Sequence, residues 1–151
     1  MKGDKTVRII IPKEKDIPAC ADVYIEAYKA EPWNEVYETS EVEKYISEYM
    51  NSSTKCCYAL VENEEIMGVA LGLIVPCISV PFFRIEDFCV NPNIQRKGYG
   101  SSFMDLLLKE VVKKGCDSVL LGTQKGYPSH RFYLKNGFQE IESVLLYKEM
   151  G

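Results

Sequence analysis

Residues 95–101 read Gln-Arg-Lys-Gly-Tyr-Gly-Ser, and no other stretch says as much about the architecture. Gly98 and Gly100 let the backbone approach a ligand closely, with several N–H groups pointing in one direction. The stretch opens a helix whose apolar residues keep helical spacing as far as Lys113, and a helix N-terminus adds partial positive charge. These features predict an anion cradle suited to a pyrophosphate. A Walker loop and a dinucleotide-binding fingerprint are both excluded, because no G-K-[ST] and no correctly spaced third glycine follow.

The segments flanking this loop alternate between strand-like and helix-like patterns. A strand is predicted at residues 83–90, and a short buried strand at residues 118–123 follows the helix. Ser129 is expected to cap a brief helix that ends at Asn136-Gly137. Residue 138 and residues 144–148 are predicted to form the last strands.

The N-terminal half adds strands and two helices. A strand at residues 7–11 precedes a helix that begins after Asp16 and runs to about Tyr28. Ser40 is expected to cap a second helix. Residues 57–62 and 66–75 then form a hairpin around residues 63–65. The order predicts one mixed α/β sheet covered by helices.

The composition limits the class of protein. The chain has 151 residues, with 46% hydrophobic and 26% charged, which fits a single globular domain over residues 1–151. A net charge of −4 argues against nucleic-acid binding, and no apolar stretch is long enough for a signal peptide or a membrane span. The six cysteines show no C-x-x-C spacing and are interpreted as reduced thiols, so we expect no metal and a cytoplasmic location.

Three motifs in order resemble the GNAT superfamily of N-acetyltransferases. They are the glycine loop at 95–101, the strand Ile-Glu-Asp-Phe-Cys-Val-Asn-Pro at 85–92, and Arg-Phe-Tyr-Leu-Lys-Asn-Gly-Phe at 131–138. The element order also matches, from about residue 7 to residue 148. The resemblance implies a mostly antiparallel mixed sheet, splayed between its fourth and fifth strands. It further implies direct transfer of an acetyl group from acetyl-CoA to a primary amine.

The resemblance assigns a cofactor site to the fourth strand and the loop. Pantetheine would bind backbone groups of the strand, and the pyrophosphate would bind backbone N–H groups of the loop. Arg96 and Lys97 either add charge there or are solvated loop residues. The implied set is Phe88, Cys89, Val90, Gln95, Arg96, Lys97, Gly98, Tyr99, Gly100 and Ser101.

Two residues are predicted to move protons. The resemblance implies that Tyr133 donates a proton to the departing thiolate, a step open to a phenol with a pKa of about 10. It likewise implies that Glu86 is the base that relays the proton of the amine. Strict alternation puts Glu86 and Asp87 on opposite faces of the strand, so only one reaches the site unless a bulge intervenes. Asp87 therefore stays open as the alternative base.

The acceptor side is less defined. Trp33, Glu35 and Asp87 are candidate substrate residues, because aromatics beside carboxylates suit an amine, although Trp33 is equally well read as a packing anchor. The family's asparagine before the last helix is absent here, and neither Thr123 nor Gln124 can be assigned its role. His130 is more readily a capping residue than a catalyst. A non-catalytic acyl-CoA-binding domain is the alternative function, and a homodimer is left open.

Overall fold

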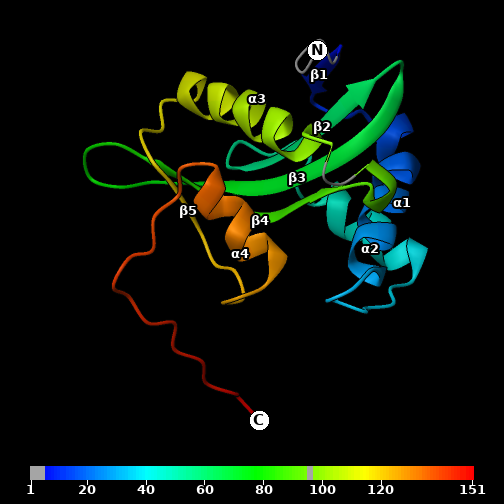
Figure 1. The fold of residues 1–151 in the computed structure, drawn as a ribbon. Coiled ribbons are helices and arrows are strands. Elements are labelled where there is room, and N and C mark those ends of the chain that lie inside the picture. The colour runs from blue at the N-terminus through cyan, green and yellow to red at the C-terminus, as the bar shows by residue number, and fades with distance from the viewer. Residues whose placement is uncertain (1–5, 95–96) are drawn as a thin grey trace.

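The structure, a computed structural model, describes residues 6–94 and 97–151, and its centre is a five-stranded sheet (Figure 1). The strands follow one another in sequence order across the sheet, and all neighbours are antiparallel except the parallel pair β4–β5. Their bounds are β1 (Val7–Ile10), β2 (Lys55–Glu62), β3 (Glu65–Val75), β4 (Phe82–Val90) and β5 (Val119–Leu121). The predicted mixed α/β architecture is confirmed.

Helices cover both faces of this sheet (Figure 1). Helices α1 (Ile17–Lys29) and α2 (Thr39–Ser47) pack on one face, around a core that includes Cys89 of β4. Helices α3 (Tyr99–Lys113) and α4 (Pro128–Lys135) supply the other core, together with Phe83 and Ile85 of β4. Short 3-10 turns at Glu14–Asp16 and Pro92–Ile94 complete the elements. Strand β4 therefore lies between two separate clusters of buried side chains.

The predicted splay between the fourth and fifth strands is present. Strand β5 pairs only with Phe83, Arg84 and Ile85, the first half of β4. After Leu121 the chain leaves the sheet and turns into the loop that leads to α4. The second half of β4, which carries Asp87, thus has no β5 residue opposite it.

A β-bulge interrupts β4 at Glu86. Asp87 pairs with Leu71 and Ile85 pairs with Gly72, so Glu86 is one residue more than β3 can match. The tight contact beside the bulge explains the glycine, since a Cβ on Gly72 would stand 2.2 Å from the ring of Phe83. Strict alternation therefore does not hold at this point, and the bulge that the sequence leaves open is present.

Several helix boundaries are as predicted and others are not. Asp16 is the N-cap of α1, and Gly137, with a φ of 90°, follows α4 as expected. The cap predictions for Ser40 and Ser129 are wrong. Glu38 precedes α2, and Tyr127 precedes α4 because Pro128 supplies a preset first helical residue.

The predicted last strands are also absent from this chain. No residue from 139 to 151 belongs to a helix or strand, and all of them are exposed. The segment extends away from the sheet (Figure 1). Its apolar residues match a strand pattern, but the chain offers them no strand to pair with.

The cysteines and helix lengths fit the sequence interpretation. All six cysteines are free, and Cys20, Cys57, Cys89 and Cys116 are buried. Within the described ranges, no helix combines the length and apolarity needed to cross a bilayer.

Candidate active site

Asp87 lies at the centre of a cluster of tyrosine hydroxyls. Tyr45 donates a hydrogen bond to its Oδ2 at 2.6 Å, and Tyr28 and Tyr24 donate to Oδ1 at 3.0 and 3.2 Å. The donors come from α1 and α2, and the acceptor comes from β4 just after the bulge. Three phenols therefore surround one partly buried carboxylate, which we call the tyrosine cluster: Tyr24, Tyr28, Tyr45 and Asp87.

Burial controls the electrostatics of this cluster. It raises the pKa of Asp87 above the ordinary value, and the nearby charge of Glu86 acts in the same direction. The hydrogen bonds from the three tyrosines act in the opposite direction without cancelling the rise. Burial and the charge of Asp87 in turn raise the pKa of Tyr24 and Tyr28, so both phenols stay protonated and remain donors.

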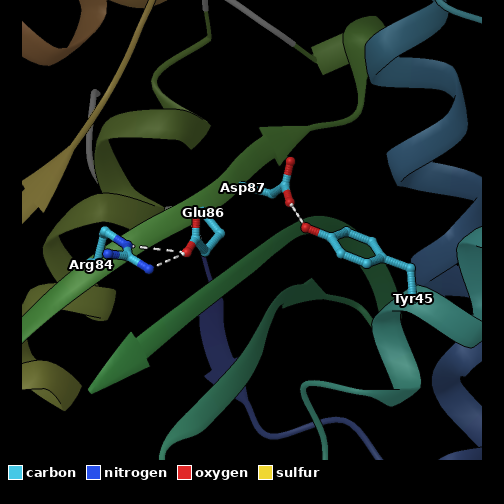
Figure 2. Close-up of polar contacts among 4 residues, drawn as sticks. All are labelled: Tyr45, Arg84, Glu86 and Asp87. Carbon is cyan, nitrogen blue, oxygen red and sulfur yellow. Dashed lines mark hydrogen bonds and ion pairs between the residues drawn. The ribbon is translucent and has the colours of Figure 1, made fainter. Parts of the chain in front are cut away.

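Glu86 has a different partner and a more exposed position. Its Oε1 accepts hydrogen bonds from Arg84 Nε at 3.1 Å and Arg84 Nη2 at 3.0 Å. Figure 2 shows Glu86 turned toward Arg84 while Asp87 is turned toward Tyr45. Burial raises the pKa of Tyr49, and the charges of Glu86 and Asp87 add to the rise, so both carboxylates lie within electrostatic reach of this tyrosine. The bulge thus brings together two acidic residues that alternation would have separated.

Tyr133 is buried among aromatic rings on the other side of β4. Its ring centroid lies 5.3 Å from Phe132, 5.5 Å from Phe138 and 6.3 Å from Phe88, and its side chain is only 8% exposed. Burial raises its pKa, and the charge of Asp87 adds to the rise. The hydroxyl is therefore held protonated, and it lies within electrostatic reach of Asp87.

The start of α3 has the backbone geometry expected of a ligand-binding turn. Gly98 is the N-cap residue and has a φ of 83°, which an L side chain rarely adopts. Gly100 lies against the ring of Phe132, since a Cβ there would stand 3.0 Å from it. The hydroxyl of Tyr99 donates to Glu62 at 2.7 Å and ties the helix start to β2. The helix begins at Tyr99, within the stretch 95–101 that is predicted to open it.

The other predicted loop residues divide into two groups. Lys97 is exposed and Ser101 is half-buried within the first turn of α3. Gln95 and Arg96 lie outside the described residues. The first-turn amides of an α-helix have no carbonyl partner within the helix, so this turn suits an anionic group.

The residues present fit the cosubstrate that the resemblance implies. Phe88 and Cys89 lie in the half of β4 beyond its pairing with β5, where an extended amide chain can add to a strand. Val90 ends the same strand and leads through a 3-10 turn toward α3. In the parts of the chain that are described, no group of His, Cys, Asp or Glu has an arrangement that would hold a metal ion.

The predicted acceptor residues differ in their burial and in their contacts. Trp33 is half-buried, and its ring packs against Tyr28 of α1 at 5.9 Å and against Tyr127 at 5.1 Å. It thereby connects the loop between α1 and α2 to the residue that precedes α4. Glu35 is exposed and accepts a hydrogen bond from Tyr37 at 2.8 Å. Of the predicted acceptor residues, Asp87 is the one bound by several tyrosines.

His130 and Thr123 have structural partners. The Nδ1 atom of His130 accepts the backbone N–H of Gly126 at 3.0 Å, and its Nε2 lies 3.1 Å from Glu140. The hydroxyls of Thr123 and Ser129 lie 2.7 Å apart. These contacts hold the loop before α4 in place, in line with a capping role for His130.

The three tyrosines of the cluster escaped the sequence interpretation. Their helical spacing assigns Tyr24, Tyr28 and Tyr45 to the apolar faces of two helices, and their rings do pack there. A buried tyrosine hydroxyl nevertheless needs a polar partner. The i, i+4 pair Tyr24 and Tyr28, in a chain with ten tyrosines, is a signal that such a partner lies across from α1.

Comparison with known proteins identifies the family. The model of the acetyltransferase (GNAT) family matches residues 19–138, which include β4, the start of α3 and all of α4. No curated protein sequence matches the chain.

Solved structures with similar folds include proteins of different description. An aminoglycoside acetyltransferase, meta-AAC0020, from an uncultured soil metagenomic sample in complex with sisomicin has a TM-score of 0.77, with 17% identity over 98% of this chain and 99% of that one. A possible acetyltransferase from Clostridium difficile 630 reaches a TM-score of 0.83, with 12% identity over 95% and 97%. A transcriptional regulator from Bacillus halodurans C-125 has a TM-score of 0.77, with 20% identity over 95% and 99%. At these identities the likeness concerns the fold alone.

Proposed function

Because the chain belongs to the GNAT acetyltransferase family, we propose that it transfers an acetyl group from acetyl-CoA directly to the primary amine of a small molecule or peptide. The observation that carries the proposal is the arrangement around β4: three tyrosine hydroxyls of α1 and α2 hold the partly buried carboxylate of Asp87, and Tyr133 of α4 packs against the ring of Phe88 in the other core. Both Asp87 and Phe88 belong to the half of β4 that extends beyond its pairing with β5. Acetyl-CoA supplies the activated thioester when it binds.

The chain's part in binding is carried by backbone groups. The first turn of α3, entered through Gly98, holds the diphosphate on its amides, and Lys97 adds charge at the exposed edge. Backbone groups of β4 from Phe88 to Val90 hold the pantetheine arm as a short added strand. Gln95 and Arg96 belong to the same predicted cradle. This arrangement orients the thioester beside Asp87 and Tyr133.

Asp87 is proposed to receive the proton of the acceptor amine. An ammonium has a pKa of about 10.4 and must lose a proton before its nitrogen attacks. Burial shifts the pKa of Asp87 toward neutral pH, and a base is most effective when its pKa is close to the pH of the reaction. The tyrosine cluster keeps the carboxylate oxygens in place. Glu86, the base expected from the sequence, is here the second candidate, because its carboxylate forms an ion pair with Arg84.

Tyr133 is proposed to donate its hydroxyl proton to the sulfur that leaves. Its raised pKa keeps the phenol protonated until negative charge develops on that sulfur. Cys89 lies close by, but burial raises the pKa of its thiol, so no thiolate is at hand for a covalent route. Direct attack by the amine is therefore the mechanism proposed.

The acceptor side suits an amine that is positively charged or that can pack against aromatic rings. Trp33, Tyr28 and Tyr127 form an aromatic wall near Asp87, and Glu35 adds a negative charge at the surface. The structural neighbour bound to sisomicin supports testing aminoglycosides among the acceptors. A non-catalytic acyl-CoA-binding domain is the second candidate, since another neighbour is a transcriptional regulator.

Two measurements test the function together. We expect acetyl-CoA to bind by calorimetry and free CoA to be released in a screen of polyamines, aminoglycosides, amino acids and peptides. In Gly98→Val, a side chain at a φ of 83° fills the turn, so acetyl-CoA binding should be lost. Binding without CoA release from any acceptor would favour the non-catalytic domain, and unchanged affinity in Gly98→Val would reject the cradle.

A further inference from the structure

Two aromatic rings from segments far apart in the sequence meet on the acceptor side. Trp33 belongs to the loop between α1 and α2, and Tyr127 is the residue that precedes α4. Their ring centroids lie 5.1 Å apart with an interplanar angle of 62°, which is the edge-to-face geometry of a favourable aromatic pair. We call this contact the clasp.

The clasp is linked to the proposed base through one tyrosine. The ring of Trp33 lies 5.9 Å from the ring of Tyr28, and the hydroxyl of Tyr28 donates to Asp87 at 3.0 Å. Tyr127 comes from a different direction, along the chain that leaves the sheet after Leu121. An amine that enters between these two segments therefore meets the clasp before it reaches the carboxylate.

Each ring of the clasp is fixed to its own side. The backbone N–H of Trp33 donates to the carbonyl of Ala30 at 3.1 Å, and that of Tyr127 donates to the carbonyl of Gln124 at 3.1 Å. In the parts of the chain that the structure describes, no hydrogen bond runs between residues 30–38 and residues 122–130. The ring contact that joins the two sides is therefore one that a ligand can displace, since an aromatic pair contributes only about 2- to 10-fold to an equilibrium constant.

We propose that the clasp selects the acceptor amine by its width. An amine on a slender, unbranched chain reaches Asp87 with both rings in place, and the rings then flank its ammonium group. An amine on a ring system has to separate Trp33 from Tyr127, so its affinity is reduced by the factor that the contact contributes. This inference rests on the proposed function, because it concerns how the acceptor reaches the base, and it makes both aromatic residues determinants of specificity.

The first experiment tests the clasp without any ligand. Trp33 is the only tryptophan of the chain, so its fluorescence reports on this contact directly. We expect Tyr127→Ala to shift the emission to longer wavelength and to increase quenching by acrylamide, because the indole gains contact with water. Tyr127→Phe keeps the ring and should change neither quantity.

Tyr147→Ala is the matched control for this experiment. It removes the same side chain from a position that is 87% exposed and lies outside all helices and strands. An emission spectrum that responds no more to Tyr127→Ala than to Tyr147→Ala would overturn the clasp.

The second experiment compares a linear diamine with the aminoglycoside sisomicin. We expect Tyr127→Ala to raise the preference for sisomicin about 2- to 10-fold, in affinity measured by calorimetry and in kcat/KM measured by CoA release. Tyr127→Phe should keep the wild-type preference. In the wild type, sisomicin should shift the emission of Trp33, whereas the diamine should bind without shifting it. An equal shift with both amines would overturn selection by width.

Failure of the clasp and failure of the proposed reaction give different results. Transfer to both amines, with a preference that Tyr127→Ala does not change, would overturn the clasp and leave the reaction intact. A changed preference in affinity without release of CoA would overturn the reaction and leave the clasp intact. If neither amine binds to the wild type or to Tyr127→Ala, both proposals are refuted.

Discussion

The two sides of β4 use the same residue type for opposite purposes. On the side of α1 and α2, tyrosine hydroxyls donate to a carboxylate, as Tyr45 does to Asp87 at 2.6 Å. On the side of α3 and α4, Tyr133 lies among the rings of Phe88, Phe132 and Phe138. The surroundings of a phenol therefore decide whether its hydroxyl binds a carboxylate or its ring packs among other rings.

This contrast predicts a different role for each side of β4, which experiments can test. The α1/α2 side stabilises the negative charge of Asp87, and the α3/α4 side keeps the hydroxyl of Tyr133 neutral. If the proposal is right, substitutions on the two sides will change different measurements.

The largest effect is expected from Tyr133→Phe. Loss of a positioned acid lowers turnover by about 10²- to 10⁴-fold. Affinity for acetyl-CoA should stay near normal, because the aromatic packing is kept. Steady-state turnover and calorimetry measure the two quantities.

Tyr58→Phe is the matched control for this substitution. Tyr58 is buried in β2 and belongs to the same core as Tyr133, but it lies outside the proposed site. Turnover at the wild-type level in Tyr133→Phe would remove the phenol from the mechanism.

Asp87→Asn should follow, with a loss of turnover of about 10²-fold and a changed pH profile. A base works only when deprotonated, so the rate of the wild type should climb as pH rises through the raised pKa of Asp87. That limb should flatten in Asp87→Asn. Glu86→Gln should cost less, and a larger loss there would exchange the roles of the two carboxylates.

Removing single hydroxyls from the tyrosine cluster should act through Asp87. Hydrogen bonds from the phenols lower its pKa, so Tyr45→Phe should move the rising limb of the pH–rate profile to higher pH. Tyr24→Phe should move it less, because its contact is 3.2 Å instead of 2.6 Å. Each variant should lose about 1–3 kcal/mol of stability in urea unfolding. A shift toward lower pH would contradict the role of the hydroxyls.

The smallest effect concerns stability and pH. Because the folded state raises the pKa of Asp87, it binds that proton more tightly than the unfolded chain. The resulting stabilisation is complete below the unfolded value of about 3.9 and is lost as pH rises through the folded pKa. Across that window the free energy of unfolding of the wild type, relative to Asp87→Asn, should fall with a slope of about 1.4 kcal/mol per pH. A difference that does not change between pH 4 and 8 would show that folding leaves the pKa of this carboxyl where it was.

The sequence predicts most of the fold because its periodicities are local. The apolar spacing of α3 and the β-rich runs of β2 to β4 each contain the information for one element. The predicted caps of α2 and α4 are wrong. For α4 the reason is that a proline at residue 128 competes with Ser129 for the helix start. The predicted last strands are wrong for another reason: residues 144–148 have the pattern of a strand, but a pattern does not show whether a strand lies beside them to pair with.

The candidate site divides in the same way. Glu86, Asp87 and Tyr133 can be found from their motifs, but the bulge at Glu86 depends on how β3 pairs with β4. The bonds from Tyr24, Tyr28 and Tyr45 depend on long-range packing between helix and strand. The apolar pattern correctly places the rings of these residues in the core, but it does not predict the hydrogen-bond partners of their hydroxyls.

The surplus residue in β4 has a consequence for how the chain would tolerate a deletion. Ile85 and Asp87 already face the adjacent residues Gly72 and Leu71, so excising Glu86 would restore a regular ladder in which both keep their present cross-strand partners. Asp87 would keep its tyrosine partners, and only Glu86 would be lost. Strand β4 is thus a complete strand that contains one additional acidic residue.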